Sequence, residues 1–453
     1  MNPFTHVNEP EAVIETAKDL KAWVITVNMG YGHQRAAYPL RNLAHLRVIA
    51  ANEDELVSGE ERKQWVKMQK FYEGVSRIKD VPLIGSWLWE QYDRFQRIAS
   101  LYPFRDQSKP SSVVCRLDNM MKKGFGMSIV DEVNKTNLPV VSTFFVPPLA
   151  ASMSGIKRVY SIVTDVDINR IWVAKDPEAA TITYLAPSNE ARYRLLQYGV
   201  PKERVRVTGF PLPEENVATV EMDLSRRLGR LDTNNTFLNR YRHTVFNILG
   251  SPTHSNEPIT ITYAVGGAGA QMNVAEKILK SLKAELKNDT YRLNLIAGTR
   301  LEVKAYFEKI IADLGLELEL DRSIRILYEP NIQDYFTLFN QFLRTTDILW
   351  TKPSELVFYA GLGIPLVMSD PLGAHEETNR EWISRMGAGF PMENPRYANE
   401  WLKHWLESGM LAEAAFDAYT KAPRFGTENV KRILASDDPL NVPLRENTPN
   451  YFL

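Results

Sequence analysis

The sequence predicts an α/β protein built from two Rossmann-like, doubly wound domains that face each other across a cleft. Short β-branched apolar runs alternate with longer amphipathic stretches, which is the pattern of parallel strands joined by crossover helices. The alternation occurs twice, and each half has a glycine-rich turn directly after its first predicted strand. The length of 453 residues suits two or three domains.

The predicted strands form two sets. The first set is residues 22–27, 46–51, 140–145, 159–164, 182–186 and 205–208, and the second is 259–264, 293–297, 324–328, 348–350 and 365–368. We therefore expect an N-terminal domain (1–225), a linker region (226–257), a C-terminal domain (258–410) and a helical tail (411–453). The tail is expected to pack back on the N-terminal domain.

Residues 59–108 interrupt the simple alternation with aromatic side chains interleaved with lysines and arginines, such as Trp65, Trp87 and Arg94. Two interpretations stand. In one, two helices pack their aromatic face on the first domain. In the other, the segment is an insertion that binds an acceptor or rests on a membrane, with aromatic and cationic side chains at the interface.

Bulk composition excludes several classes of function. Lys and Arg total 54 against 55 Asp and Glu, so the net charge of −1 gives no reason to expect a nucleic-acid partner. The single cysteine, Cys115, cannot form an intrachain disulfide or a cysteine-based zinc site. No signal-peptide pattern and no apolar run of about 20 residues is found. We expect a cytoplasmic protein whose membrane contact, if any, is peripheral and at the inner face.

The first glycine turn is Gly30-Tyr31-Gly32-His33, between a predicted strand and a predicted helix. Two glycines let the backbone come close to a ligand, and a helix N-terminus attracts a diphosphate or an oxyanion. His33 lies at the strand edge where such folds bind ligands, and an imidazole titrates near neutrality, which suits proton transfer. The alternative is a helix-capping or core histidine.

The second glycine turn is Gly266-Gly267-Ala268-Gly269-Ala270-Gln271, again between a strand and a helix. Three glycines within four positions form a backbone cradle for phosphate oxygens, and the alternative is a tight packing turn. One such turn at the start of each half indicates two facing domains with a ligand between them.

A polar turn, Lys352-Pro353-Ser354-Glu355, follows the strand predicted at 348–350. Glu355 can accept two hydrogen bonds from vicinal hydroxyls, as a ribose offers, and Ser354 would point toward phosphate. Alternatively, Ser354 caps a helix that has Glu355 in its first turn.

A second polar turn runs from Asp370 to Asn379 and contains Gly373, His375 and Glu376. Carboxylates and amides of this kind read sugar hydroxyls, because each hydroxyl both donates and accepts a hydrogen bond. The alternative is an acidic first helical turn. The spacing is not that of a helix-borne zinc motif.

Asp165 and Asp167 follow the strand predicted at 159–164. They could provide a general base or orient one. A cation site and a solvated loop are the alternatives.

These segments resemble the inverting glycosyltransferases of the GT-B architecture that include the lipid II-forming N-acetylglucosaminyltransferase and the monogalactosyl- and glucosyl-diacylglycerol synthases. The likeness extends from about residue 22 to 410. It implies that the C-terminal domain binds a UDP-sugar, with Gly266 to Gly269 at the diphosphate, Tyr328 near the uracil, and Glu376 to Asn379 at the sugar. The N-terminal domain would hold the acceptor, and His33 matches the histidine of the family's N-terminal loop.

Two positions depart from the family's pattern. Phe358 stands where the family usually has a ribose-binding glutamate, and Glu355, about one turn earlier, is the candidate replacement. His375 stands where a glutamine often opens the sugar-reading loop.

We expect inverting transfer of a hexose or an N-acetylhexosamine from a UDP-sugar to a hydroxyl acceptor, with His33 or Asp165 as the base. The aromatic insertion favours a lipid acceptor. No cofactor and no metal ion is expected to take part. The alternatives are a nucleotide-sugar epimerase or hydrolase on the same frame, and a non-catalytic nucleotide-sugar-binding protein.

Overall fold

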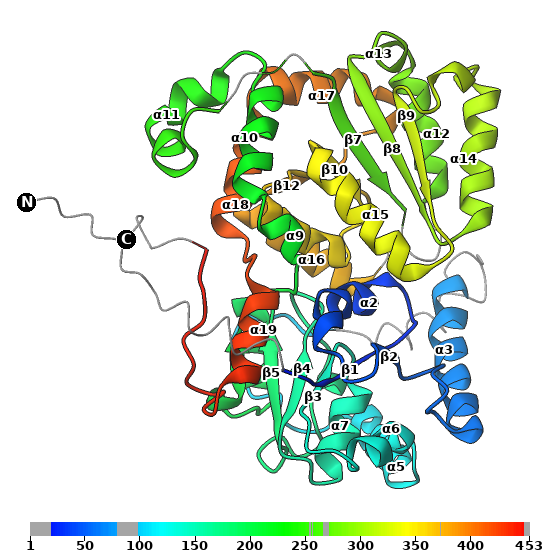
Figure 1. Ribbon diagram of the computed structural model, residues 1–453, viewed down its shortest axis with the longest axis vertical. Coiled ribbons are helices and arrows are strands. Elements are labelled where there is room, and N and C mark those ends of the chain that lie inside the picture. The colour runs from blue at the N-terminus through cyan, green and yellow to red at the C-terminus, as the bar shows by residue number, and fades with distance from the viewer. Residues whose placement is uncertain are drawn as a thin grey trace, which may run out of the picture.

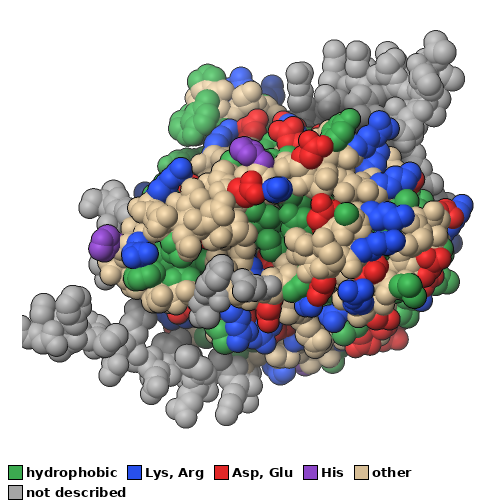
Figure 2. Space-filling view, turned by 90° about the horizontal axis from the view of Figure 1, so that it is seen from above, with side chains coloured by type: hydrophobic (Ala, Val, Ile, Leu, Met, Phe, Trp, Pro, Cys, Tyr) green, Lys and Arg blue, Asp and Glu red, His purple; other side chains and the backbone are tan. Residues whose placement is uncertain are grey.

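The computed structural model describes residues 20–78, 98–252, 255, 257–265, 271–371 and 373–447 (Figure 1). It confirms the predicted fold class. Two sheets of six strands each, parallel throughout, form two Rossmann-like domains with flanking helices. Basic and acidic side chains are interspersed over the described part of the face in Figure 2.

The N-terminal sheet has the strand order β2-β1-β3-β4-β5-β6. Its strands are β1 (Trp23–Thr26), β2 (Ile49–Ala50), β3 (Val140–Ser142), β4 (Val159–Ile162), β5 (Ile182–Ala186) and β6 (Val205–Val207). Each lies within a strand predicted from sequence. The central strands β1, β3, β4 and β5 are buried along their whole length, because helices cover both faces of a parallel sheet.

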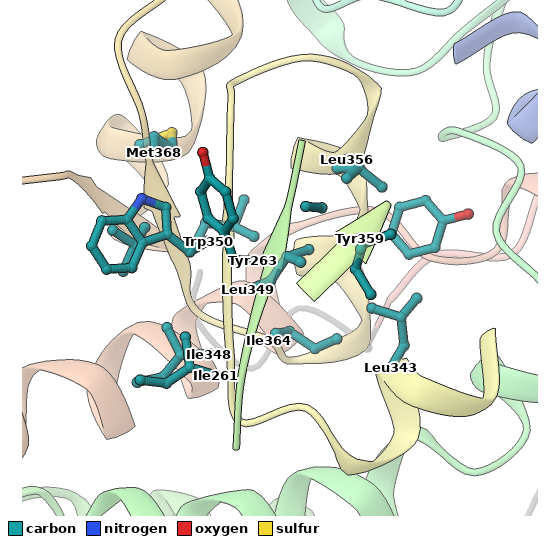
Figure 3. Close-up of a cluster of buried hydrophobic side chains, with 14 of the residues drawn as sticks. Ile261, Tyr263, Leu343, Ile348, Leu349, Trp350, Leu356, Tyr359, Ile364 and Met368 are labelled. Atoms are coloured by element: carbon teal, nitrogen blue, oxygen red, sulfur yellow. The ribbon is translucent and has the colours of Figure 1, made fainter. Parts of the chain in front are cut away.

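The C-terminal sheet has the order β12-β11-β10-β7-β8-β9. Its strands are β7 (Ile259–Ala264), β8 (Tyr291–Gly298), β9 (Ile324–Tyr328), β10 (Ile348–Thr351), β11 (Leu366–Met368) and β12 (Gly389–Pro391). Apolar side chains from β7, β10 and β11 meet those of flanking elements in the cluster of Figure 3. Strand β12 was not predicted. It is short, and Gly389 lies so close to β11 that an added Cβ would be 2.5 Å from the carbonyl oxygen of Leu366.

The helices follow the crossover pattern. In the N-terminal domain they are α2 (Tyr31–Ala37), α3 (Gly59–Ile78), α5 (Ser112–Lys122), α6 (Met127–Val133), α7 (Val146–Met153), α8 (Asn189–Gln197) and the 3-10 turns η2 (Tyr38–Leu43), η3 (Arg170–Trp172) and η4 (Lys202–Arg204). The chain then continues through α9 (Glu214–Val217), α10 (Val220–Leu231) and α11 (Thr236–Leu249). The later helices are α12 (Met272–Ser281), α13 (Lys283–Lys287), α14 (Leu301–Asp313), α15 (Ile332–Thr345), α16 (Ala374–Met386), α17 (Ala398–Glu407), α18 (Met410–Lys421), α19 (Gly426–Ala435) and the turns η5 (Glu317–Glu319), η6 (Glu355–Leu362) and η7 (Pro395–Tyr397).

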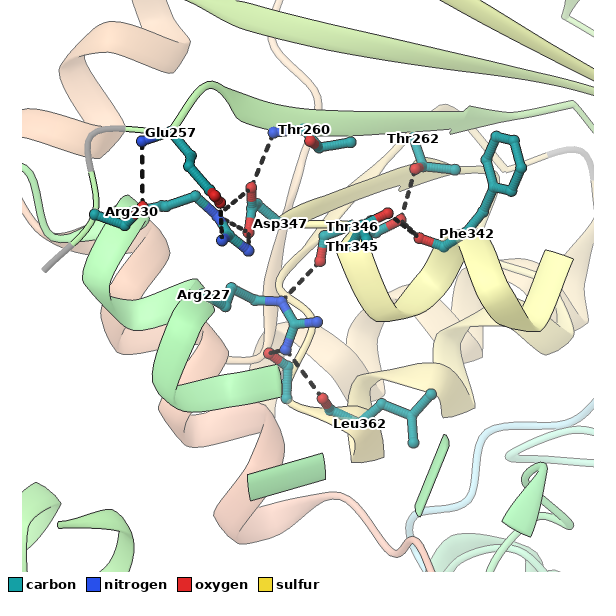
Figure 4. Close-up of polar contacts among 12 residues, drawn as sticks. Arg227, Arg230, Glu257, Thr260, Thr262, Phe342, Thr345, Thr346, Asp347 and Leu362 are labelled. Carbon is teal, nitrogen blue, oxygen red and sulfur yellow. Dashed lines mark hydrogen bonds and ion pairs between the residues drawn. The ribbon is translucent and has the colours of Figure 1, made fainter. Parts of the chain in front are cut away.

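Helix α10 belongs physically to the C-terminal domain (Figure 4). The Arg227 guanidinium donates to the carbonyls of Thr346 and Gly363, each at 2.8 Å. Arg230 forms an ion pair at 2.7 Å with Asp347, which is fully buried and also accepts from the Thr260 amide. The segment predicted as a linker region therefore begins inside this helix.

The chain returns to the N-terminal domain after α18. Helix α18 packs on α10, α17 and η6, whereas α19 contributes Val430, Ile433 and Leu434 to a core with the N-terminal strands. Arg158 donates to the Leu434 carbonyl at 2.9 Å. The crossing thus lies between α18 and α19, later than residue 411, where the tail was predicted to begin.

Helix α3 forms the first part of the predicted aromatic insertion. Trp65 is 1% exposed and packs on Phe125, with 4.8 Å between the ring centroids. Val66 points outward and is 45% exposed. The inward position of Trp65 agrees with the packing interpretation for this part of the helix. Residues 79–97, with Trp87 and Arg94, lie outside the described residues.

Candidate active site

His33 lies on α2, directly beyond the end of β1, and its ring is partly buried. Its Nδ1 atom is 2.7 Å from the carbonyl oxygen of Thr143 and 3.3 Å from the hydroxyl of Thr164. Because a carbonyl can only accept, Nδ1 carries the hydrogen, and the neutral ring keeps its lone pair on Nε2. Burial lowers the pKa of His33, an effect that Asp165, the Thr143 carbonyl and Glu355 oppose in part. These surroundings favour the neutral ring with its hydrogen on Nδ1.

The two aspartates after β4 have different surroundings. Asp167 is buried and receives two hydrogen bonds from the Arg194 guanidinium, at 2.7 and 2.8 Å. This pairing leaves Asp167 with a structural role and unsuited to share a cation with Asp165. Asp165 is partly buried, and its charge acts on both His33 and Lys352.

Asn379 joins the two domains at this point. Its side-chain oxygen accepts from the Val166 amide at 3.1 Å. Its amide nitrogen donates to the Pro353 carbonyl at 3.1 Å and to Asp165 Oδ1 at 3.4 Å. The side chain is 0% exposed, so these partners in both domains occupy the amide that was predicted to read a sugar.

Lys352 sits among carboxylates of both domains. Its Nζ donates to Glu376 Oε1 at 2.7 Å, and Glu376 is buried beneath it. Burial alone would lower the pKa of Lys352, but Glu376, Glu355 and Asp165 together raise it. The charge of Asp165 of the N-terminal domain thus acts on Lys352 across the domain boundary.

Glu355 faces the N-terminal domain. Its Oε1 atom is 3.2 Å from Nε of Arg35, and a Cβ added to Gly32 would lie 3.4 Å from its Oε2 atom. Gly32 thus allows the close approach of the first glycine turn to η6. The carboxylate predicted to bind ribose is in contact with α2, and Ser354, which precedes η6, makes no side-chain capping bond.

Phe358, at the family's ribose-glutamate position, lies in an apolar core. It stacks on Phe210 with a centroid distance of 4.6 Å and an interplanar angle of 8°, and it also contacts Trp382. It is 2% exposed. The position that would carry a ribose-binding carboxylate therefore helps to join the domains.

The remaining predicted residues lie at other strand ends. Gly266, Gly267, Ala268 and Gly269 lie outside the described residues. Gln271, the next residue, donates from its side chain to the Asp370 carbonyl at 2.8 Å and so contacts the start of the second polar turn.

Gly30 begins α2 with a φ of 99°, a conformation that glycine favours. Tyr328 ends β9 under the Lys304 ammonium, 5.6 Å from the ring centroid. A Cβ on Gly373 would lie 3.1 Å from the His375 ring, and the charge of His375 acts on His33.

Sequence reasoning missed Arg35, which is 2% exposed and reaches into the C-terminal domain. Its Nη2 donates to the Tyr335 hydroxyl at 2.6 Å. The available signal was its spacing: Tyr31 and Arg35 are four residues apart on a helix and so share a face. Within the described ranges, no group of three or more His, Cys, Asp or Glu side chains could hold a metal ion.

Two parallel Rossmann-like domains whose strand ends meet, with a histidine, a lysine and carboxylates at the meeting point, have the GT-B arrangement. The chain is 21% identical over 432 residues to a "processive diacylglycerol beta-glucosyltransferase" of Bacillus cytotoxicus, covering 90% of this chain and 92% of the relative. It is 21% identical to the enzyme of the same name from Bacillus subtilis, with 55% of each chain covered. These relatives confirm the predicted resemblance and support a glycosyltransferase.

A solved structure and a family model also match this chain. MurG of Acinetobacter baumannii matches with a TM-score of 0.47 and 14% identity, covering 91% of this chain and 99% of that one. A family model described as a domain of unknown function (DUF6938) matches residues 302–415.

Proposed function

We propose that this protein transfers a hexose or an N-acetylhexosamine from a UDP-sugar to a hydroxyl acceptor, with inversion at the anomeric carbon. The observation that carries the proposal is the junction between the domains. Asn379 of one domain bonds to Asp165 of the other, and Gly32, beside His33, packs against Glu355. Lys352, which precedes the Asn379 partner Pro353, pairs there with Glu376 at 2.7 Å. A base beside one domain and cationic and polar groups beside the other suit an acceptor and a nucleotide-linked donor that react between them.

In the proposed reaction, His33 Nε2 takes the proton of the acceptor hydroxyl. The acceptor oxygen forms a bond to the anomeric carbon as the bond from that carbon to the diphosphate oxygen breaks, and UDP leaves with the electron pair. Backbone N–H groups of the Gly266 to Gly269 turn and the Lys352 ammonium would stabilise the negative charge that develops on the diphosphate. Asp165 would favour the imidazolium that forms, because its charge already acts on His33.

We propose a lipid acceptor, and helix α3 supports this choice. The outward face of α3 carries Arg62, Lys63, Val66 and Lys67, which line a shallow hollow. Basic side chains around an exposed apolar one suit contact with an anionic lipid surface. None of the described helices combines the length and apolar character needed to cross a bilayer.

Lipid contact can be tested by co-sedimentation with vesicles of phosphatidylglycerol and phosphatidylcholine. Exchanging Lys63 and Lys67 for Glu should weaken binding to anionic vesicles, whereas Lys403→Glu on α17, which is 70% exposed, should not. Equal binding by both variants would remove α3 from the proposal.

The central test is a screen of UDP-glucose, UDP-galactose and UDP-N-acetylglucosamine against diacylglycerol, a polyprenyl-linked glycan and soluble alcohols, read by mass spectrometry. His33→Ala should lower turnover by at least roughly 100-fold, the usual contribution of a general base. The exposed His45, in the same domain, provides the matched control. A near-normal rate in His33→Ala would remove this residue from the mechanism.

The same reagents distinguish a transferase from an epimerase, a hydrolase and a non-catalytic binding protein. An epimerase converts a UDP-sugar to its isomer without an acceptor, and a hydrolase releases free sugar. A binding protein is stabilised by UDP in thermal denaturation but releases no UDP with any acceptor. We propose that turnover needs no metal ion, which predicts full activity in the presence of a chelator.

A further inference from the structure

Helix α2 has little stability of its own. It has seven residues, is preceded by Gly30, contains Gly32 in its first turn and has no side-chain N-cap. Helices this short are marginal in isolation, and glycine weakens them further. The orientation of α2, and therefore of His33, depends on the side chains that anchor it.

The two faces of α2 are held by different domains. Residues four apart share a helix face, whereas residues two apart point in nearly opposite directions. His33 is bonded to Thr143 of the N-terminal domain, and the Thr143 hydroxyl donates in turn to the His33 carbonyl at 2.9 Å. Tyr31 and Arg35, on the other face, both reach the C-terminal domain.

Tyr31 is seated at the end of β8. Its hydroxyl accepts from the Thr299 amide at 2.9 Å and lies 2.9 Å from the Thr299 hydroxyl. Gly298 has a φ of 66°, and a Cβ there would be 2.5 Å from the Tyr31 hydroxyl. Only glycine fits at this contact.

Arg35 is seated more deeply, in a pocket of α15 aromatic rings. Its guanidinium carbon is 4.2 Å from the Phe339 ring centroid and 5.0 Å from that of Phe336. The hydrogen bond to Tyr335 and the contact with Glu355 complete the pocket. A planar cation stacks on such rings and bonds at its edge at the same time, which a lysine cannot do.

We propose that Arg35 is a positioning residue: its seat in the C-terminal domain sets the orientation of α2 and thereby aims His33 at the ligand between the domains. The proposal rests on the proposed function in that His33 acts there as the base. Arg35 itself touches no reacting atom.

Arg35 also forms an ion pair with the Glu355 carboxylate. The charged groups that act on His33 are Asp165, Glu355 and His375, and the Glu355 carboxylate raises the pKa of His33. Without Arg35, this carboxylate loses the guanidinium that lies 3.2 Å from its Oε1 atom. The pKa of His33 should then rise, and it should fall again when Glu355 is replaced by Gln.

The test compares Arg35→Met, Arg35→Lys and the double variant Arg35→Met/Glu355→Gln with the intact protein. Arg242→Met is the matched control, because Arg242 stacks on Phe246, 5.8 Å away, on the exposed helix α11. Two readouts need no substrate: amide hydrogen exchange of residues 31–37, and NMR titration of labelled imidazoles, of which the chain has 7.

In Arg35→Met, the α2 amides should exchange at least about tenfold faster, because the local opening of a helix reports the contacts that hold it. The His33 midpoint should move to higher pH. The double variant should keep the fast exchange but lose the rise in midpoint. Arg242→Met should match the intact protein in both readouts. A folded Arg35→Met with unchanged exchange and midpoint overturns the proposal.

If Arg35→Met does not fold, the Arg35→Lys variant tests the proposal in its place. Faster α2 exchange in this charge-retaining variant supports the proposal, and exchange and midpoint equal to those of the intact protein overturn it. In the transfer assay, Arg35→Lys should lower kcat while the KM for the donor stays nearly constant. Loss of transfer in His33→Ala but not in either Arg35 variant overturns the positioning role and leaves the proposed function in place.

Discussion

Replacing Asn379 by Ala tests whether this residue joins the domains or reads a sugar. The resemblance implies a sugar contact, whereas in the structure the amide is fully buried between Val166, Pro353 and Asp165. The two roles predict different results for the free energy of unfolding and for donor binding.

The expected loss of stability can be worked from the contacts. Without the amide, the Val166 N–H and the Pro353 carbonyl stay buried and lose their hydrogen-bond partner in Asn379. Each buried group left without this partner lowers the free energy of unfolding by about 1–3 kcal/mol. The Asp165 contact is long, at 3.4 Å, and adds little. A joining role therefore predicts that the free energy of unfolding falls by about 2–6 kcal/mol, a large share of the roughly 5–15 kcal/mol of a typical domain.

Urea denaturation followed by tryptophan fluorescence measures this loss, and isothermal titration with UDP measures donor binding. Asn399→Ala is the control, since the Asn399 side chain accepts from the Ser281 hydroxyl at 2.9 Å within the C-terminal domain. The control should lose less than about 1 kcal/mol. Loss of UDP-sugar affinity in Asn379→Ala with stability unchanged would refute the reasoning and return Asn379 to the sugar site.

Three further predictions follow from the same region. Because burial lowers the pKa of His33 and only the neutral ring can accept a proton, kcat/KM should rise with pH and level off, with a midpoint below about 6.5; a midpoint above neutrality would contradict this. Phe358→Glu should not create a ribose site but should cost at least about 3 kcal/mol in urea denaturation, because it removes the stack on Phe210 and buries a carboxylate; a stable variant that binds UDP more tightly would contradict this. Small-angle scattering should give the same radius of gyration with and without UDP, since the domains already share a core; compaction on binding would show that they start apart.

Local patterns in the sequence predicted most of the fold. The predicted strands were found because each is a β-branched apolar run between polar turns, which parallel packing requires. Strand β12 was missed because Gly389-Phe390-Pro391 carries no such run. Its glycine is needed where the strand approaches Leu366, and that closeness is invisible in one sequence.

The candidate site was less predictable, because its partners are distant in the chain. His33, Asp165 and Lys352 were singled out from strand ends, and the structure brings them together. Arg35 bonds to Tyr335, 300 residues away, and no local pattern reports such a contact. The sequence places Asp167 beside Asp165 as a second carboxylate after β4. In the structure, Arg194 of α8 donates two hydrogen bonds to Asp167, and the sequence does not report this pairing.

Glu355, Phe358 and Asn379 lie at the boundary between the domains. Their side chains make contacts between the domains, which residues that only bind a ligand would not make. One apolar cluster includes Ala36, Tyr38, Val166, Phe210 and Leu212 of the N-terminal domain together with the C-terminal core. Separating the domains would expose this apolar surface, which costs about 25 cal/mol of free energy for each Å². It would also break the contacts of Arg35, Tyr31 and Asn379. The side chains of Glu355, Phe358 and Asn379 are therefore occupied by contacts between the domains.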